Sequence, residues 1–164
     1  MKNILLVCTG NTCRSPMAEA MLDEAVSDSD RLRGAVKTES AGTFAFDGSE
    51  PAQNACKVMR ELGLNIDRHR AQQVTQELVD WADVVLTMDT YGLEQMQVMF
   101  PEAAEKILPL KQFAEAGTVE KAEEEYYNID DPYGEDLDTY RACAAEIRSC
   151  IQKLVQKLED APRL

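Results

Sequence analysis

The sequence is poor in several residue types on which common catalytic and binding sites depend. Its 164 residues include one tryptophan and one histidine, and only 6% of them are aromatic. Because His69 is the only histidine, the sequence does not favour a protease that pairs a cysteine with a histidine and an asparagine. No stretch approaches the roughly 20 apolar residues of a membrane-spanning helix. We therefore expect no membrane partner.

Positive charge is scarce as well. The chain has 17 lysines and arginines against 30 aspartates and glutamates, a formal net charge of −13. Nucleic acids and anionic membrane surfaces bind basic proteins, so we expect neither as a partner. Such acidity favours basic protein substrates, and a need for solubility explains it equally well. Any site for a phosphate group must create its positive potential locally.

The cysteines show neither the even number nor the spacing of a disulfide framework or a zinc site. They are Cys8, Cys13, Cys56, Cys143 and Cys150. The last three fall on predicted helical faces and are expected in the core. Residues 1–3 run directly into a predicted strand, so we expect no signal peptide. The cysteine pattern leads us to expect a reduced, cytoplasmic protein.

Short β-rich runs alternate with helical patterns along the chain. With 45% hydrophobic residues, residues 1–164 fit a single globular domain. The alternation predicts βαβ units and a doubly wound α/β fold with a parallel sheet. Strands are predicted at residues 3–7, 36–40, 83–88 and 106–110, and helices from residue 15 and at 51–62, 89–99 and 137–158. Residues 117–128 are interpreted as a mobile surface loop or a short helix.

The most informative segment connects the first predicted strand to the first predicted helix. It reads Cys8-Thr9-Gly10-Asn11-Thr12-Cys13-Arg14-Ser15-Pro16. Backbone N–H groups of a loop that enters a helix converge on an oxyanion, and Gly10 allows close approach of the backbone. The Arg14 fork matches two phosphate oxygens, and the same positive surroundings stabilise a Cys8 thiolate. Ser15 followed by Pro16 indicates a helix N-cap.

The alternative interpretation of this segment is a buried structural cysteine followed by an ordinary turn. Ligands of doubly wound folds bind at the carboxyl ends of the strands, and Cys8 lies at the end of the first predicted strand. This position, and the glycine and asparagine within the loop, favour the phosphate site.

A second candidate group is the carboxylate of Asp131, which precedes a proline just before the last predicted helix. Transfer of a phosphoryl group to a thiolate requires a proton for the leaving atom, and a carboxylic acid over the phosphoryl group can supply it. An aspartate before proline is also a common turn. Spacing alone therefore leaves the role of Asp131 open.

Taken together, these motifs resemble the low-molecular-weight protein phosphatase family. The likeness extends over essentially the whole chain and includes residues 39–42, residues 88–89 and residues 131–133. It implies a flavodoxin-like fold with four parallel strands, and neither metal nor cofactor. It also implies a phosphorylated protein as substrate, inorganic phosphate as product, and a monomer or weak dimer.

The resemblance further implies a role for each matching residue. Cys8 attacks phosphorus while Arg14 and the amides of residues 9–13 hold the oxygens, and Asp131 protonates the leaving atom and then activates water. Asn11 holds the loop through Ser40 and His69.

Two neighbours of the nucleophile also match the family. Ser15 donates a hydrogen bond to the sulfur of Cys8. Cys13 matches the family's second cysteine, which forms a reversible disulfide with Cys8 under oxidation. The alternative for Cys13 is a small buried side chain.

The substrate depends on Thr12, because family members that act on phosphotyrosine generally carry an aliphatic residue there. The segment with threonine resembles that of the bacterial protein arginine phosphatases. Gly134 and an acidic rim that includes Asp130 and Glu135 agree with a guanidinium substrate. The aromatic side chains of Phe46 and Tyr133, expected as pocket walls, favour a phenol instead. Phosphoarginine is the favoured substrate and phosphotyrosine the alternative.

Two other functions are more remote. An arsenate reductase of related fold needs two further cysteines after the third strand, and residues 81–99 contain none. A non-catalytic phosphate-binding module could lack the nucleophile or the acid, whereas Cys8 and Asp131 are both present.

Overall fold

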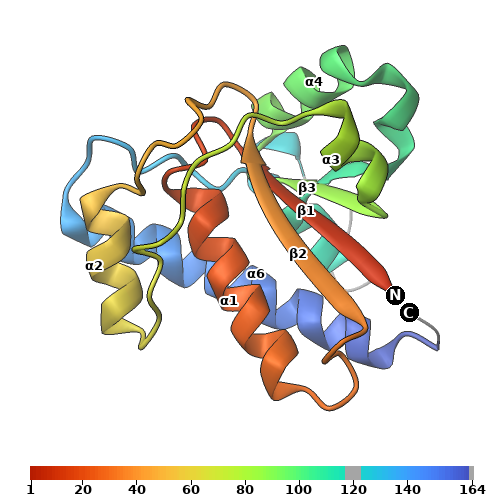
Figure 1. The fold of residues 1–164 in the computed structure, drawn as a ribbon, viewed down its shortest axis with the longest axis horizontal. Helices are drawn as coiled ribbons and strands as arrows, with labels where there is room; N and C mark the ends of the chain where they lie inside the picture. Colours follow the sequence, from red (N-terminus) through yellow and green to blue (C-terminus); the bar gives the residue numbers. More distant parts are fainter. Residues whose placement is uncertain (117–122, 163–164) are drawn as a thin grey trace.

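A parallel sheet of four strands organises the residues described by the computed structural model, 1–116 and 123–162 (Figure 1). The strands are β1 (Lys2–Cys8), β2 (Val36–Gly42), β3 (Val84–Thr87) and β4 (Ile107–Pro109), in the spatial order β2-β1-β3-β4. The helices are α1 (Arg14–Asp28), α2 (Gln53–Glu61), α3 (Gln76–Trp81), α4 (Thr90–Met99), α5 (Leu110–Glu115) and α6 (Leu137–Asp160). Two 3₁₀ helices, η1 (Pro101–Lys106) and η2 (Glu124–Tyr127), complete the described elements. The predicted α/β class and its four parallel strands are confirmed.

Both faces of the sheet are covered by helices, which explains the continuous apolar sequence of β1. Ile4 and Leu6 belong to a core shared with α1, α2, α5 and α6. Leu5 and Val7 point to the opposite face and pack in a second core with α3 and α4. Figure 1 shows α1 and α6 on one side of the sheet and α3 and α4 on the other. The central strand is therefore fixed from two sides.

The strand order places the end of β1 at the switch point of the sheet. β1 pairs with β2 on one side and with β3 on the other, all in parallel. In this register Cys8 lies beside Gly42, and Val7 lies beside Thr87. The carboxyl ends of β1, β2 and β3 thus meet at one edge, where doubly wound folds bind their ligands.

Gly42 allows the loop after β1 to pack against the end of β2. A Cβ atom at this position would overlap the carbonyl oxygen of Thr9 and crowd the Cβ of Ala45 and the backbone nitrogen of Asn11. The contrast with Gly10 is clear, since a Cβ there would meet only Thr12 Oγ1, at 3.5 Å. Close packing of protein atoms therefore requires glycine at position 42 rather than at position 10.

One helix boundary differs from the prediction. Helix α1 begins at Arg14, its N-cap is Cys13, and no side chain caps it, so the prediction of Ser15 as N-cap is wrong. The hydroxyl of Ser15 is engaged elsewhere, in contacts with Cys8 and Asn11. The predicted N-cap of α4 is confirmed, because Asp89 accepts a hydrogen bond from the backbone nitrogen of Gly92 at 2.6 Å.

Two short helices were not predicted, and a third short segment was predicted only in part. Helices α3 and α5 have six residues each, too few for a helical period to stand out. Of the predicted loop or short helix at 117–128, residues 124–127 form η2, and residues 117–122 lie outside the described part of the chain. In the described ranges, no helix combines the length and apolar character needed to cross a membrane.

Candidate active site

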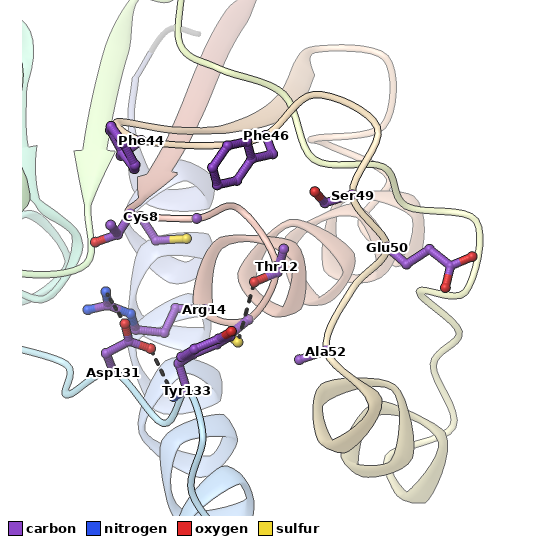
Figure 2. Close-up of a pocket in the computed structure, with 13 residues that line it drawn as sticks. Cys8, Thr12, Arg14, Phe44, Phe46, Ser49, Glu50, Ala52, Asp131 and Tyr133 are labelled. Carbon is purple, nitrogen blue, oxygen red and sulfur yellow. Dashed lines mark hydrogen bonds and ion pairs between the residues drawn. The ribbon is translucent and has the colours of Figure 1, made fainter.

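A cavity of about 420 Å³ opens at the edge where β1 and β2 end (Figure 2). Its floor is the loop after β1 and the start of α1. The residues that line it are Cys8, Thr9, Gly10, Thr12, Cys13, Arg14, Phe44, Phe46, Ser49, Glu50, Ala52, Asp131 and Tyr133. Residues more than 120 positions apart in the sequence therefore share one cavity.

Cys8 lies at the bottom of this cavity with its side chain almost fully buried. Its sulfur is 2.9 Å from the hydroxyl of Ser15 and accepts a hydrogen bond from the backbone nitrogen of Asn11 at 3.3 Å. Both contacts place hydrogen-bond donors next to the sulfur, an arrangement that suits a thiolate. The contact between Ser15 and Cys8 that the resemblance implied is present.

The loop turns through Asn11, which has a left-handed backbone with φ of 54°. Asparagine tolerates this conformation better than most residues. The buried Asn11 side chain donates to Ser40 Oγ at 3.0 Å and to Ser15 Oγ at 2.8 Å. His69 Nε2 donates to the Asn11 carbonyl at 2.7 Å, and burial lowers the pKa of His69, so the imidazole is neutral near pH 7. Side chains on three sides thus hold the unusual turn.

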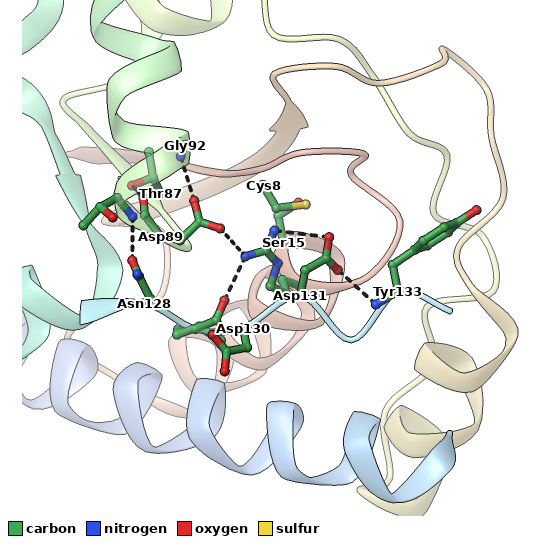
Figure 3. A network of polar contacts seen from close by, with 12 residues as sticks. Cys8, Ser15, Thr87, Asp89, Gly92, Asn128, Asp130, Asp131 and Tyr133 are labelled. Atoms are coloured by element: carbon green, nitrogen blue, oxygen red, sulfur yellow. Dashed lines mark hydrogen bonds and ion pairs between the residues drawn. The ribbon is translucent and has the colours of Figure 1, made fainter. Parts of the chain in front are cut away.

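Arg14 is buried, with 2% of its side chain exposed, and its guanidinium is held by two hydrogen bonds. Figure 3 shows Asp89 and Asp131 in this network of polar contacts. Nη1 donates to Asp89 Oδ2 at 2.6 Å and to the carbonyl of Ile129 at 2.8 Å. Burial disfavours its charged form, but the nearby Cys8 and Asp89 outweigh that effect and raise the pKa of Arg14. The cation is therefore permanent and its orientation is predetermined.

Asp131 lies at the mouth of the cavity, with 46% of its side chain exposed. Its Oδ2 is 3.6 Å from Arg14 Nη2, and its Oδ1 accepts from the backbone nitrogen of Tyr133 at 3.0 Å. The aspartate–proline segment is thus both a turn and a part of the site. A carboxyl group in this place can exchange protons with a group bound above Cys8.

The thiol of Cys13 contacts a side chain on α6. Its sulfur is 3.3 Å from the hydroxyl of Tyr140 and 3.7 Å from Thr12 Oγ1. Burial raises the pKa of the Cys13 thiol. Cys13 is therefore a less reactive thiol than an exposed cysteine would be, and all five cysteines of the chain are free in the structure.

Aromatic side chains form the exposed walls of the cavity. Phe44 and Phe46 pack edge to face with ring centroids 6.1 Å apart, and Tyr133 lies across the cavity from them (Figure 2). The prediction named Phe46 and Tyr133 but missed Phe44, which precedes Phe46 by two positions on the same loop.

The prediction that Asp130 and Glu135 form an acidic rim of the cavity is wrong. Asp130 and Glu135 are exposed but do not line the cavity, whose carboxylates belong to Glu50 and Asp131. The chain turns at Pro132 and then runs toward α2, where the Glu135 carbonyl accepts from the side chain of Asn54. Figure 2 shows the Glu50 carboxylate turned away from Cys8, and its Oε1 is 3.8 Å from Arg70.

The structure brings the predicted residues together in two groups. One group lines the cavity and comprises Cys8, Thr9, Gly10, Thr12, Cys13, Arg14, Phe46, Asp131 and Tyr133. The other lies behind the loop and comprises Asn11, Ser15, Ser40 and His69. The partner of Arg14 was missed: Asp89 was predicted only as a helix cap. Its position directly after the third strand is the signal that could have identified it.

Known proteins share this fold. The sequence matches the family of low molecular weight phosphotyrosine protein phosphatases over residues 3–163. Because the match extends over nearly the whole chain, the chain belongs to this family of cysteine-based phosphatases.

Three relatives make the comparison specific. A protein-arginine-phosphatase of Geobacillus stearothermophilus is 41% identical over 95% of each chain. The low molecular weight protein-tyrosine-phosphatase Wzb of Escherichia coli (strain K12) is 30% identical, also over 95% of each chain. The solved structure of the YwlE arginine phosphatase from Geobacillus stearothermophilus has a TM-score of 0.83 and 40% identity, and it covers 97% of this chain and 94% of that chain.

Replacing Asp89 by asparagine tests whether this carboxylate orients Arg14. Asparagine is as good an N-cap as aspartate, so helix α4 should persist while the charged contact to Arg14 is lost. We expect kcat/KM for an aryl phosphate to fall roughly ten- to a hundred-fold, the rate equivalent of about 1.5–3 kcal/mol for a hydrogen bond to a charged group. Steady-state kinetics, with circular dichroism to verify folding, measures this effect.

The matched control is Asp136→Asn, which changes the aspartate that caps α6 through Thr139 and lies outside the cavity. Its kinetics should equal those of the wild type. Wild-type kinetics for Asp89→Asn would show that Arg14 needs no support from Asp89.

Proposed function

We propose that this chain is a cysteine-dependent protein phosphatase that hydrolyses phosphoarginine through a phosphocysteine intermediate. The observation that carries the proposal is the convergence of Cys8, Arg14 and Asp131 on one cavity with Thr12 in its wall. Relatives at 41% and 29% identity that are named protein-arginine-phosphatases support the choice of substrate.

In the first step, the Cys8 thiolate attacks phosphorus and the bond between phosphorus and the guanidinium nitrogen breaks. The protonated carboxyl of Asp131 gives its proton to that nitrogen. The loop amides and the fixed Arg14 guanidinium bind the phosphoryl oxygens, where they stabilise the charge of the transition state. Because these donors are already oriented, little reorganisation accompanies the reaction.

In the second step, water replaces the sulfur at phosphorus. Asp131, now a carboxylate, takes a proton from the attacking water, and the bond between phosphorus and Cys8 breaks. The Ser15 hydroxyl, 2.9 Å from the sulfur, donates a hydrogen bond to the departing thiolate. Inorganic phosphate leaves, and the site returns to its starting protonation state.

Thr12 supports phosphoarginine as the substrate. It lies in the cavity wall, and its hydroxyl can accept a hydrogen bond from a guanidinium or orient the attacking water. The carboxyl group of Asp131 at the cavity mouth can bond to the N–H groups of a guanidinium, whereas the ring of a phosphotyrosine offers it no such donor.

Phosphotyrosine is the second candidate, and the aromatic walls favour it. Phe44, Phe46 and Tyr133 present apolar faces on which a phenol ring could stack. The Wzb relative and the family description both carry the name of tyrosine phosphatases.

The proposal includes the setting in which the enzyme works. Its partner is a phosphorylated protein, its product is inorganic phosphate, and residues 1–164 act as one domain in a monomer or weak dimer. We place it in the cytoplasm because five free cysteines, all of them buried, suit a reducing compartment.

Replacing Thr12 by valine tests substrate choice, because valine keeps the branched shape and removes the hydroxyl. For the wild type, we expect a higher kcat/KM with a phosphoarginine peptide than with the matched phosphotyrosine peptide. In Thr12→Val this ratio should fall about ten-fold, the effect of one hydrogen bond to a charged group. Initial rates on the two peptides measure it.

Thr12→Ser is the control for Thr12→Val, because serine retains the hydroxyl and should keep the preference for phosphoarginine. A wild type that prefers phosphotyrosine, with the same ratio in both variants, would make the chain a tyrosine phosphatase.

Replacing Asp131 by asparagine tests the general acid. Asparagine can still accept from the Tyr133 nitrogen, so the turn should persist without an exchangeable proton. We expect phosphoenzyme formation to slow by roughly 10²- to 10⁴-fold with poor leaving groups and much less with good ones. Rapid-quench kinetics on a series of aryl phosphates measures this dependence.

The neighbouring change Asp130→Asn is the control, because Asp130 does not line the cavity. It should leave all rates unchanged. Equal slowing of good and poor leaving groups by Asp131→Asn would assign the proton to another group.

A further inference from the structure

Glu19 is a half-buried carboxylate behind the phosphate loop that the proposed mechanism does not use. It lies on α1 one turn after Ser15, on the helix face that meets β2. The hydroxyl of Ser40, at the end of β2, donates a hydrogen bond to Glu19 Oε2. Glu19 does not line the cavity, and its link to the site runs through Ser40.

The orientation of the Asn11 amide sets the direction of the hydrogen bonds between Ser40 and Cys8. Asn11 Oδ1 accepts from the backbone nitrogen of Gln72 at 3.0 Å, which fixes which end of the amide is oxygen. The two hydrogens of Asn11 Nδ2 then go to Ser40 Oγ and Ser15 Oγ. The amide has no further hydrogen to donate.

Each serine hydroxyl on this path has a single hydrogen to donate. Because each already accepts a hydrogen bond from Asn11, its own hydrogen goes to its other partner. Ser15 Oγ accepts from Asn11 and therefore donates to the Cys8 sulfur, 2.9 Å away. Ser40 Oγ accepts from Asn11 and donates to Glu19. The path ends at a group that accepts without donating, which is the property of a carboxylate.

We infer that Glu19 is a positioning residue for Cys8: its carboxylate accepts the Ser40 proton, which keeps Ser40 as an acceptor for Asn11 and directs the Ser15 hydroxyl at the sulfur. The inference rests on the proposed function, because it assigns Glu19 to the step in which the Cys8 thiolate leaves phosphorus. A neutral Glu19 carries its own hydrogen, and its bond to Ser40 loses the strength of a charge-assisted contact.

The surroundings of Glu19 make its carboxylate form unfavourable for stability. Burial is the largest effect, the Ser40 hydrogen bond acts against it, and Asp23 and Glu39 add repulsion, which together raise the pKa of Glu19 to about 7. The folded chain therefore binds a proton that the unfolded chain has lost. Stability from this group is full below the ordinary pKa of 4.5 and is lost as the pH rises toward 7.

Because the charged form of Glu19 lowers stability, the effect of a substitution on stability can be told apart from its effect on catalysis. Above pH 7, neutral glutamine at position 19 avoids the cost of a half-buried charge, so Glu19→Gln should raise the melting temperature at pH 8. The same variant should lower kcat about five-fold with KM unchanged, the rate equivalent of the net effect of one hydrogen bond. A residue that served only the fold would not lower kcat while raising stability.

The experiment measures kcat, KM and melting temperature from pH 5.5 to 8.5 with an aryl phosphate. The wild-type profile of kcat should contain an ionisation near pH 7 that Glu19→Gln lacks. Asp23→Asn is the matched control, because Asp23 lies one turn further along α1 and does not belong to the hydrogen-bond path. It should keep the wild-type kcat and move the ionisation to lower pH, since one repulsive neighbour is removed.

Ser40→Ala provides a second variant that cuts the path at the next residue. It should lose the same ionisation, and adding Glu19→Gln to it should have no further effect on kcat. Wild-type kcat and pH profile in Glu19→Gln would overturn the inference and leave the proposed phosphatase intact. A parallel fall of kcat and melting temperature at pH 8 would also overturn it. A wild type without phosphatase activity would instead overturn the proposed function.

Discussion

The site depends on one constraint: the chain must reverse directly after β1 so that the backbone N–H of Asn11, the Ser15 hydroxyl and the Arg14 guanidinium all lie near the sulfur of Cys8. The reversal passes through the left-handed backbone of Asn11, a conformation of higher energy for most residues. Asn11 keeps it because its side chain and carbonyl bond to Ser15, Ser40, Gln72 and His69. The end of β2 also contributes, since only glycine at position 42 leaves room for the loop.

A second consequence of this geometry is electrostatic. The proposed function requires a chain with a net charge of −13 to bind an anion, and the structure offers one buried arginine beside the loop after β1 rather than a basic surface. The negative charge of Asp89 offsets the cost of burying the Arg14 cation and fixes the orientation of its guanidinium. Asp131 remains exposed at the cavity mouth. The two carboxylates near Arg14 therefore differ in burial, and in the proposed mechanism the more buried one holds the cation while the more exposed one exchanges protons with the substrate.

Much of the site could be predicted because its central residues are adjacent in sequence. Cys8 and Arg14 lie at the two ends of one loop, and the predicted strand before this loop placed them at the ligand-binding edge of the sheet. Ser40 and His69 came from a family resemblance, which also gave a role to the candidate Asp131, since no local pattern joins residues so far apart. Phe44 and Asp89 were missed as site residues because their neighbours are set by packing: Phe44 by the loop after β2, Asp89 by the pairing of β3 with β1. Ser15 shows the opposite error, because a good capping residue has its hydroxyl bonded to a sulfur instead.

The central claim is that the sulfur of Cys8 carries the phosphoryl group during turnover. The most direct measurement is rapid quenching of the enzyme during hydrolysis of an aryl phosphate, followed by mass spectrometry of the peptide that contains Cys8 and Cys13. The account predicts phosphate on Cys8, formed at least as fast as the enzyme turns over, retained in Cys13→Ser and absent in Cys8→Ala together with all activity. Turnover by Cys8→Ala, or phosphate on Cys13 in the wild type, would contradict it.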